Sequence, residues 1–178
     1  MITRNNFVFI GLKIVAWVIF VGLCIEAGGL IVNFIFSLYK PEFVQNLYQK
    51  LDLSEIYNRS KWAFFEMYSF VLLISVLKAY LFYLVIKLIS KLNLSNPFNS
   101  FVSAQITQIS YYTLSIGLLS YLARQAAENL LHRGFEINTL SQFWVDSQAF
   151  ILMAAVIYVI ATIFSKGVEI QKENDLTV

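Results

Sequence analysis

Four apolar stretches constrain most strongly what this sequence can fold into. They lie at residues 14–36, 63–89, 98–122 and 143–164. Each stretch has about the 20 residues that an α-helix needs to cross the hydrocarbon of a bilayer. Only two prolines and seven glycines interrupt 178 residues, which favours long helices over the turn-rich strands of a membrane barrel. We expect an all-α fold, a four-helix transmembrane bundle in a single membrane domain that covers residues 1–178.

The composition excludes several classes of function. With 58% hydrophobic and 13% charged residues, a net charge of +2 and dispersed basic residues, the chain does not predict direct nucleic-acid binding. Cys24 and His132 are the only residues of their types, so neither an internal disulfide nor a metal site with cysteine or histidine spacing is expected. The sequence also lacks a glycine-rich phosphate-binding loop. We expect no enzyme activity, no cofactor and no metal.

The third stretch is the most polar of the four. Ser103, Gln105, Thr107, Gln108, Ser110 and Ser115 dilute it. Neighbouring helices should therefore shield it from lipid. Its helix is predicted to begin at Pro97, with Ser95 or Asn96 as the capping residue, and to run past the bilayer as far as Gly134.

The outer connections carry interfacial features. Pro41 opens a segment in which Phe43, Leu47 and Leu51 recur every fourth residue, which predicts an amphipathic helix on the membrane surface. Trp62 and Trp144 follow the pattern of tryptophans at the outer ends of spans. Lysines and arginines divide equally between the two sides, but those on the side of the termini lie closer to span ends. Both termini are therefore expected in the cytoplasm.

Two charged residues fall near the middle of apolar stretches. Glu26 lies near the centre of the first and Lys78 near the centre of the second. Each would cost roughly 3 kcal/mol at the centre of a lone helix, so each should face protein. In antiparallel helices the two side chains differ in depth by only about 5 Å. We predict an intramembrane polar pair, or a shared polar network, of Glu26 and Lys78.

Other small or polar side chains support this predicted polar face. Gly22, Glu26, Gly29 and Asn33 are four, three and four residues apart, which places them on one stripe of a helix. On the second and third stretches, Ser75, Tyr112 and Ser115 are expected at similar depth. This polar face either fixes the helix register or forms a proton-linked or ligand-linked switch. A third alternative is a different helix rotation, with Lys78 stretching toward the interface.

Residues 165–178 form a polar tail after the fourth stretch. Glu169 and Glu173 are four residues apart, which predicts a short helical extension projecting into the cytoplasm. The tail either only solubilises this end of the chain or binds a partner. The residues expected to contact a partner are Glu169, Gln171, Glu173, Asn174, Asp175 and Leu176.

The closing residues "GVEIQKENDLTV", together with Asn96, Pro97 and Phe98, carry a family resemblance. The chain resembles the bacterial four-helix membrane family known as domain of unknown function 2975, with Ile170 in place of the usual leucine. The resemblance implies a location in the bacterial cytoplasmic membrane and no established activity. It also implies a partner, because members are often encoded beside a small helix-turn-helix transcription regulator.

Three functions fit these observations. The first is a nonenzymatic membrane regulator or sensor that engages a cytoplasmic helix-turn-helix regulator through its tail. The second is a small proton-coupled transporter with Glu26 as the carboxylate and a homo-oligomer supplying the pathway. Against the transporter, Lys78 would neutralise Glu26, and no inverted repeat or broken helix is visible in the sequence. The third is an accessory subunit whose polar third span docks another membrane protein.

Overall fold

The structure is a computed structural model, and it describes residues 2–40, 44, 53–93, 97–135, 137–144 and 146–176. All regular secondary structure in these ranges is helical. The elements are α1 (Ile2–Tyr39), α2 (Ser54–Arg59), α3 (Lys61–Lys91), α4 (Ser100–His132), the 3₁₀ helix η3 (Asn138–Phe143) and α5 (Ser147–Leu176). The all-α prediction is confirmed over the described residues.

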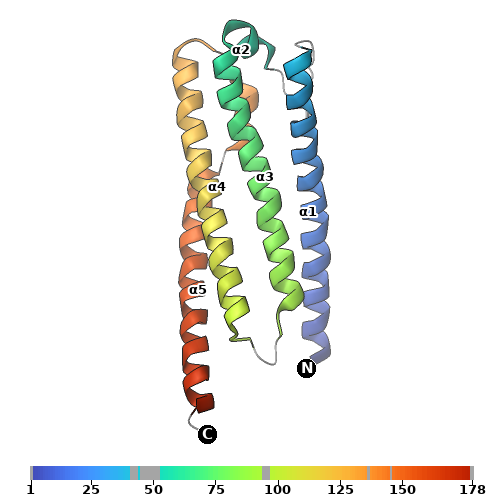
Figure 1. The fold of residues 1–178 in the computed structure, drawn as a ribbon, viewed down its shortest axis with the longest axis vertical. Coiled ribbons are helices and arrows are strands. Elements are labelled where there is room, and N and C mark those ends of the chain that lie inside the picture. Colours follow the sequence, from blue (N-terminus) through green and yellow to red (C-terminus); the bar gives the residue numbers. More distant parts are fainter. Residues whose placement is uncertain are drawn as a thin grey trace.

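Four long helices lie roughly parallel to one long axis (Figure 1). α1 packs chiefly on α3, α3 also packs on α4, and α4 has its most extensive contacts with α5. The beginning of α5 lies against Gly117, near the middle of α4, because a Cβ built on Gly117 would lie 3.2 Å from the Ser147 carbonyl oxygen. α5 therefore begins about halfway along α4, and its other end extends beyond the remaining helices (Figure 1).

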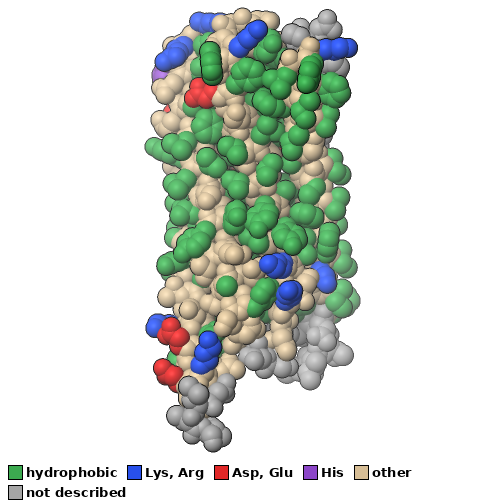
Figure 2. Space-filling model, in the orientation of Figure 1, with side chains coloured by type: hydrophobic (Ala, Val, Ile, Leu, Met, Phe, Trp, Pro, Cys, Tyr) green, Lys and Arg blue, Asp and Glu red, His purple; other side chains and the backbone are tan. Residues whose placement is uncertain are grey.

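Within the described residues, three segments are long and apolar enough to cross a membrane. They are Phe7–Tyr39, Lys61–Lys91 and Leu140–Asn174. Hydrophobic side chains cover the middle of the face shown in Figure 2, whereas lysines, arginines and acidic residues gather toward its two ends. Apolar side chains on the outside of a long helical protein are expected where lipid replaces water as the solvent.

The start of α4 differs from the predicted position, whereas its end agrees. α4 begins at Ser100, and the side chain of Asn99 accepts a hydrogen bond of 2.9 Å from the Val102 amide. Asn99, rather than Ser95 or Asn96, is thus the capping residue, so the predicted start at Pro97 is wrong. At the other end, the helix stops at His132. Gly134 follows with a φ of 80°, a backbone conformation that residues other than glycine rarely adopt.

α5 begins later and ends later than the predicted stretch 143–164. The carbonyl of Asp146 accepts the amide of Phe150, which closes the first turn, so the helix starts at the Asp-Ser pair rather than at Phe143. Trp144 precedes it and is only 4% exposed, whereas Trp62 is 86% exposed. Trp144 is thus a core residue, and the prediction that it lies at an interface is wrong.

The polar residues of α4 are shielded only in part, because Gln108 and Ser115 are exposed. Gln105, Ser110, Thr113 and Ser120 are all buried. Ser110 donates a hydrogen bond of 2.9 Å to the Ala154 carbonyl of α5, and Thr113 donates one of 2.7 Å to the Ile109 carbonyl of its own helix. These hydroxyls therefore cost little inside the bundle, because the backbone satisfies them. The amphipathic segment predicted from Pro41 through Phe43, Leu47 and Leu51 lies outside the described residues.

Candidate functional site

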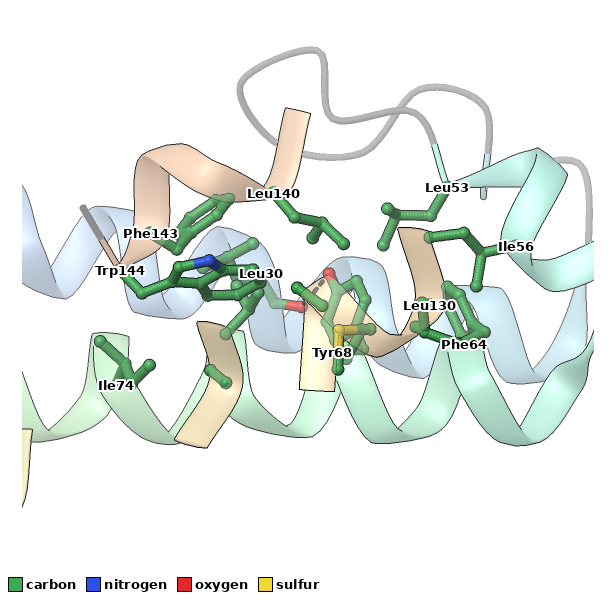
Figure 3. Packing of buried hydrophobic residues seen from close by; sticks show 14 of the residues in the cluster. Leu30, Leu53, Ile56, Phe64, Tyr68, Ile74, Leu130, Leu140, Phe143 and Trp144 are labelled. Atoms are coloured by element: carbon green, nitrogen blue, oxygen red, sulfur yellow. Dashed lines mark hydrogen bonds between the residues drawn. The ribbon is translucent and has the colours of Figure 1, made fainter. Parts of the chain in front are cut away.

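The chain between α4 and α5 enters the interior of the bundle. Leu140, Phe143 and Trp144 are all buried, and they belong to the same hydrophobic cluster as Leu30 of α1 and Ile74 of α3. Figure 3 shows Trp144 and Leu140 between these two helices. In this part of the molecule the η3 segment packs on α1, α3 and α4.

Lys78 lies at the end of η3. Its side chain is half-buried, and its ammonium donates a long hydrogen bond of 3.5 Å to the Phe143 carbonyl. Phe143 is the last residue of η3, so its carbonyl has no following helical turn to bond with. The charge of Lys78 is therefore directed at the point where the backbone leaves η3, three residues before Asp146 and the start of α5.

The structure does not join Glu26 and Lys78 in an ion pair. Ion pairs are found between Arg124 and Glu128 and between Lys166 and Glu169, whereas Lys78 bonds to the Phe143 carbonyl. Glu26 is half-buried, and no hydrogen bond to another described residue is found for it. The prediction of a directly bonded pair is therefore corrected to two separate charges.

Helix rotation explains the separation. α1 packs on the face of α3 that carries Tyr68 and Tyr83, because Leu30 accepts the Tyr68 hydroxyl and Phe20 lies 6.3 Å from the Tyr83 ring. Lys78 is ten residues from Tyr68, which rotates it by about 80° away from that face. Glu26 and Lys78 were predicted at similar depth, but their side chains lie on helix faces that do not point toward each other.

The predicted stripe on α1 is displaced by one position. A Cβ built on Gly22 would meet nothing within 4 Å, and the buried side chains of α1 include Ala27 and Leu30. A shift of one residue turns a helix by about 100°. α1 therefore buries the stripe that carries Ala27 and Leu30, and Glu26, Gly29 and Asn33 are only half-buried.

The remaining members of the predicted polar face lie apart from one another. Ser75 is buried on α3. Tyr112 is half-buried and its ring lies 4.8 Å from that of Tyr80. Ser115 is exposed and donates to the Tyr111 carbonyl of its own helix. They do not form one network with Lys78.

The end of α5 forms a second cluster, where it meets the start of α4. Phe98 lies against Gly167, and its ring centroid is 5.2 Å from that of Phe164. Val168 is buried beside this contact. A hollow of about 170 Å³ adjoins it, lined by Phe98, Asn99, Ser100, Val168, Gln171 and Lys172. The two segments that carry the family resemblance, one before α4 and one at the end of the chain, are therefore neighbours in space.

The predicted tail residues lie on a helix rather than on an irregular tail. Glu169, Glu173 and Asn174 are exposed and Gln171 is half-buried, whereas the side chains of Asp175 and Leu176 lie outside the described part. Lys166 and Glu169 form an exposed ion pair of 2.6 Å. The extension is a continuation of α5, with one charged surface and one side packed on the start of α4.

Sequence reasoning missed three features of these clusters. The partner of Lys78 is a backbone carbonyl, which leaves no trace in the side-chain pattern. α5 approaches Gly117 closely, and Phe98 approaches Gly167 closely. In the sequence, only the two glycines themselves indicate these contacts. In the part of the chain that the structure describes, no group of three or more histidine, cysteine, aspartate or glutamate side chains is placed to hold a metal ion.

The fold defines an all-helical protein with three segments able to span a membrane. Residues 46–178 match the family described as protein of unknown function (DUF2975), and the chain belongs to this family. The match excludes α1, and with it Leu30 of the first cluster, and it includes the whole of the second cluster. No curated protein and no solved structure matches the sequence.

Proposed function

We propose that this protein is a nonenzymatic sensor or regulator of the bacterial cytoplasmic membrane, which binds a cytoplasmic partner through the end of α5. In this proposal α1, α3, α4 and α5 form a four-helix membrane bundle with both termini in the cytoplasm. The contact of α4 with α5 supports four membrane helices, because the buried Ser110 hydroxyl of α4 finds its acceptor in the Ala154 carbonyl of α5.

The observation that carries the proposal is the continuity of α5. The helix begins beside the Lys78 contact at the end of η3 and continues without a break to Leu176. A continuous helix transmits displacement or rotation from one end to the other, since its backbone hydrogen bonds resist bending. A change at the Lys78 carbonyl contact would therefore reach the exposed charges of Glu169 and Glu173.

Lys78 is suited to bias such a change. An ammonium inside a bilayer is costly, so it favours whichever arrangement of η3 gives it an acceptor. A ligand, a proton or a change in the lipid that altered this acceptor would shift the equilibrium between two packings of η3. The exposed face of α5 beyond Phe164 would then be presented differently to a partner, for which we propose a small helix-turn-helix regulator.

The experiment is affinity capture from native membranes with an N-terminal tag, which leaves the α5 extension free. Removal of residues 169–178 should abolish capture of a helix-turn-helix protein while the bundle remains inserted. Lys78→Met should change the captured amount although the residue is far from the extension. Lys87→Met is the matched control, because Lys87 lies over the Phe101 ring near the end of α3. Equal capture by the full-length and shortened chains would contradict the proposal.

A small transporter is the second candidate. The η3 segment favours it, since a short 3₁₀ helix separated from the next α-helix resembles the interrupted helices of transporter substrate sites. Glu26, half-buried on α1, would be its proton-coupled carboxylate, and a homo-oligomer would complete the pathway. Proton-driven uptake into proteoliposomes that disappears in Glu26→Gln would favour this candidate over the regulator.

A further inference from the structure

The start of α4 and the extension of α5 meet at one close contact. A Cβ built on Gly167 would lie 2.5 Å from Phe98 Cδ1 and 2.8 Å from Cε1. A side chain at position 167 therefore requires the Phe98 ring to move. The same ring lies 5.2 Å from that of Phe164, about one turn earlier on α5, so Phe98 bridges two successive turns of the helix.

Gly167 is also the weakest point of this part of α5. Glycine has the largest backbone freedom of any residue and is unfavourable in a helix interior. Beyond it, Val168 is buried, whereas Glu169, Ile170 and Lys172 are exposed. The extension thus has one apolar anchor of its own, directly beside the Phe98 contact.

We propose that Phe98 is a latch that holds residues 168–176 in line with α5, and that Gly167 is the hinge on which this extension bends when the ring leaves. The inference rests on the proposed function, because it names the contact that decides how the extension is presented to a partner. Phe98 is 40% exposed and lies outside α4, so its ring can leave without unpacking that helix. The adjoining hollow of about 170 Å³ is lined by Phe98 itself, so there is free space beside this side chain.

The latch is tested by hydrogen exchange on the full chain in lipid nanodiscs, without any partner. Phe98→Ala should raise the exchange rate of amides 169–174 by about tenfold, because an aromatic contact no longer opposes local opening. Exchange in the first half of α5 should stay unchanged. Phe98→Leu keeps an apolar side chain in the connection, so it should raise the exchange rates of the same amides by a smaller factor. This variant replaces Phe98→Ala in the test if Phe98→Ala does not insert into the membrane.

Phe101→Ala is the matched control. It removes a ring of the same size three residues along the chain, but this ring lies under Lys87 and Lys91 of α3. The control should leave exchange of the extension unchanged. If Phe98→Ala has no effect, or if Phe101→Ala has an equal effect, the latch is overturned.

A double variant tests the hinge. Phe98→Ala combined with Gly167→Ala should return the exchange of amides 169–174 toward the native rate, because alanine stiffens the helix where the ring no longer obstructs it. Exchange as fast as in Phe98→Ala alone would overturn the assignment of Gly167 as the hinge.

Partner capture separates the latch from the proposed function. If Phe98→Ala speeds exchange and also changes capture, the latch controls presentation of the extension. If exchange speeds up and capture does not change, the role in presentation is overturned although the proposed function stands. Loss of capture only on removal of residues 169–178, with native exchange in Phe98→Ala, would support the proposed function and overturn the latch.

Discussion

The hydroxyl of Tyr68 on α3 donates a hydrogen bond of 3.0 Å to the backbone carbonyl of Leu30 on α1 (Figure 3). Tyr68 is fully buried, and its ring stacks on that of Phe34 at 5.1 Å. We expect Tyr68→Phe to lower the free energy of unfolding by about 1 kcal/mol, because it removes one buried hydrogen bond and keeps the ring. Thermal unfolding in detergent measures the change. Tyr121→Phe is the control, since Tyr121 is exposed, and an equal loss in both variants would contradict the prediction.

Gly117 should tolerate no larger side chain. A Cβ at this position would lie 2.7 Å from Ile151 Cγ1 and 3.0 Å from its backbone nitrogen, so Gly117→Ala has to push α4 and α5 apart. We expect a loss of about 1–3 kcal/mol in unfolding free energy, typical of an overpacked core. Gly22→Ala is the matched control, because nothing lies within 4 Å of a Cβ there. The unfolding free energy of Gly22→Ala should equal that of the native protein or exceed it by up to about 1 kcal/mol, because alanine has the higher helix propensity. The reverse order of the two variants would refute the packing argument.

Arg59 fastens α2 to the end of α4. Its guanidinium donates hydrogen bonds of 2.8 Å to the carbonyls of Gly134 and Arg133 and lies 4.3 Å from the centre of the Phe135 ring. Lysine keeps the charge but lacks the planar fork, so Arg59→Lys should cost about 1 kcal/mol locally. We expect faster hydrogen exchange at the amides of residues 133–135, which bond to the last turn of α4. Arg133→Lys, which leaves those carbonyls in place, should not change this exchange.

Lys78 should limit stability rather than increase it. An ammonium in the apolar interior costs roughly 3 kcal/mol, and its bond to the Phe143 carbonyl is long. We therefore expect Lys78→Met to raise the unfolding temperature by several degrees and Lys78→Glu to lower it, as measured by thermal unfolding in the same detergent. A Lys78→Met protein less stable than the native one would mean that the carbonyl contact outweighs the burial cost.

The sequence predicted the long helices because apolar side chains recur over whole membrane-crossing lengths. α1 and α3 contain their predicted stretches, α4 covers its stretch from Ser100 onward, and Gly134 ends α4 as expected. The rotation of α1 was not predictable from spacing alone. Stacking glycines with Glu26 on one stripe favours a close helix contact, but the observed face is the one on which Leu30 accepts the Tyr68 hydroxyl and Phe34 stacks on the Tyr68 ring.

The site was less predictable than the fold. The apolar run from Phe143 suggested a span that starts at an interface, whereas Trp144 is apolar because it packs inside the bundle. The Asp-Ser helix start at residues 146 and 147 was the better signal for where α5 begins. Contacts between segments far apart in the chain, such as Phe98 with Gly167, carry no periodic pattern and require the three-dimensional structure.

The chief helix neighbour of α1 is α3, and this determines the order in which the protein can be assembled. In the proposed membrane bundle α1 leaves the ribosome before α3, so Glu26 would enter the bilayer before Lys61–Lys91 is available to cover it. The long apolar surface of α1 lets the insertion machinery accept one carboxyl without a neighbour. A second acidic residue on α1 would therefore block insertion at the first step, before any part of the finished bundle exists.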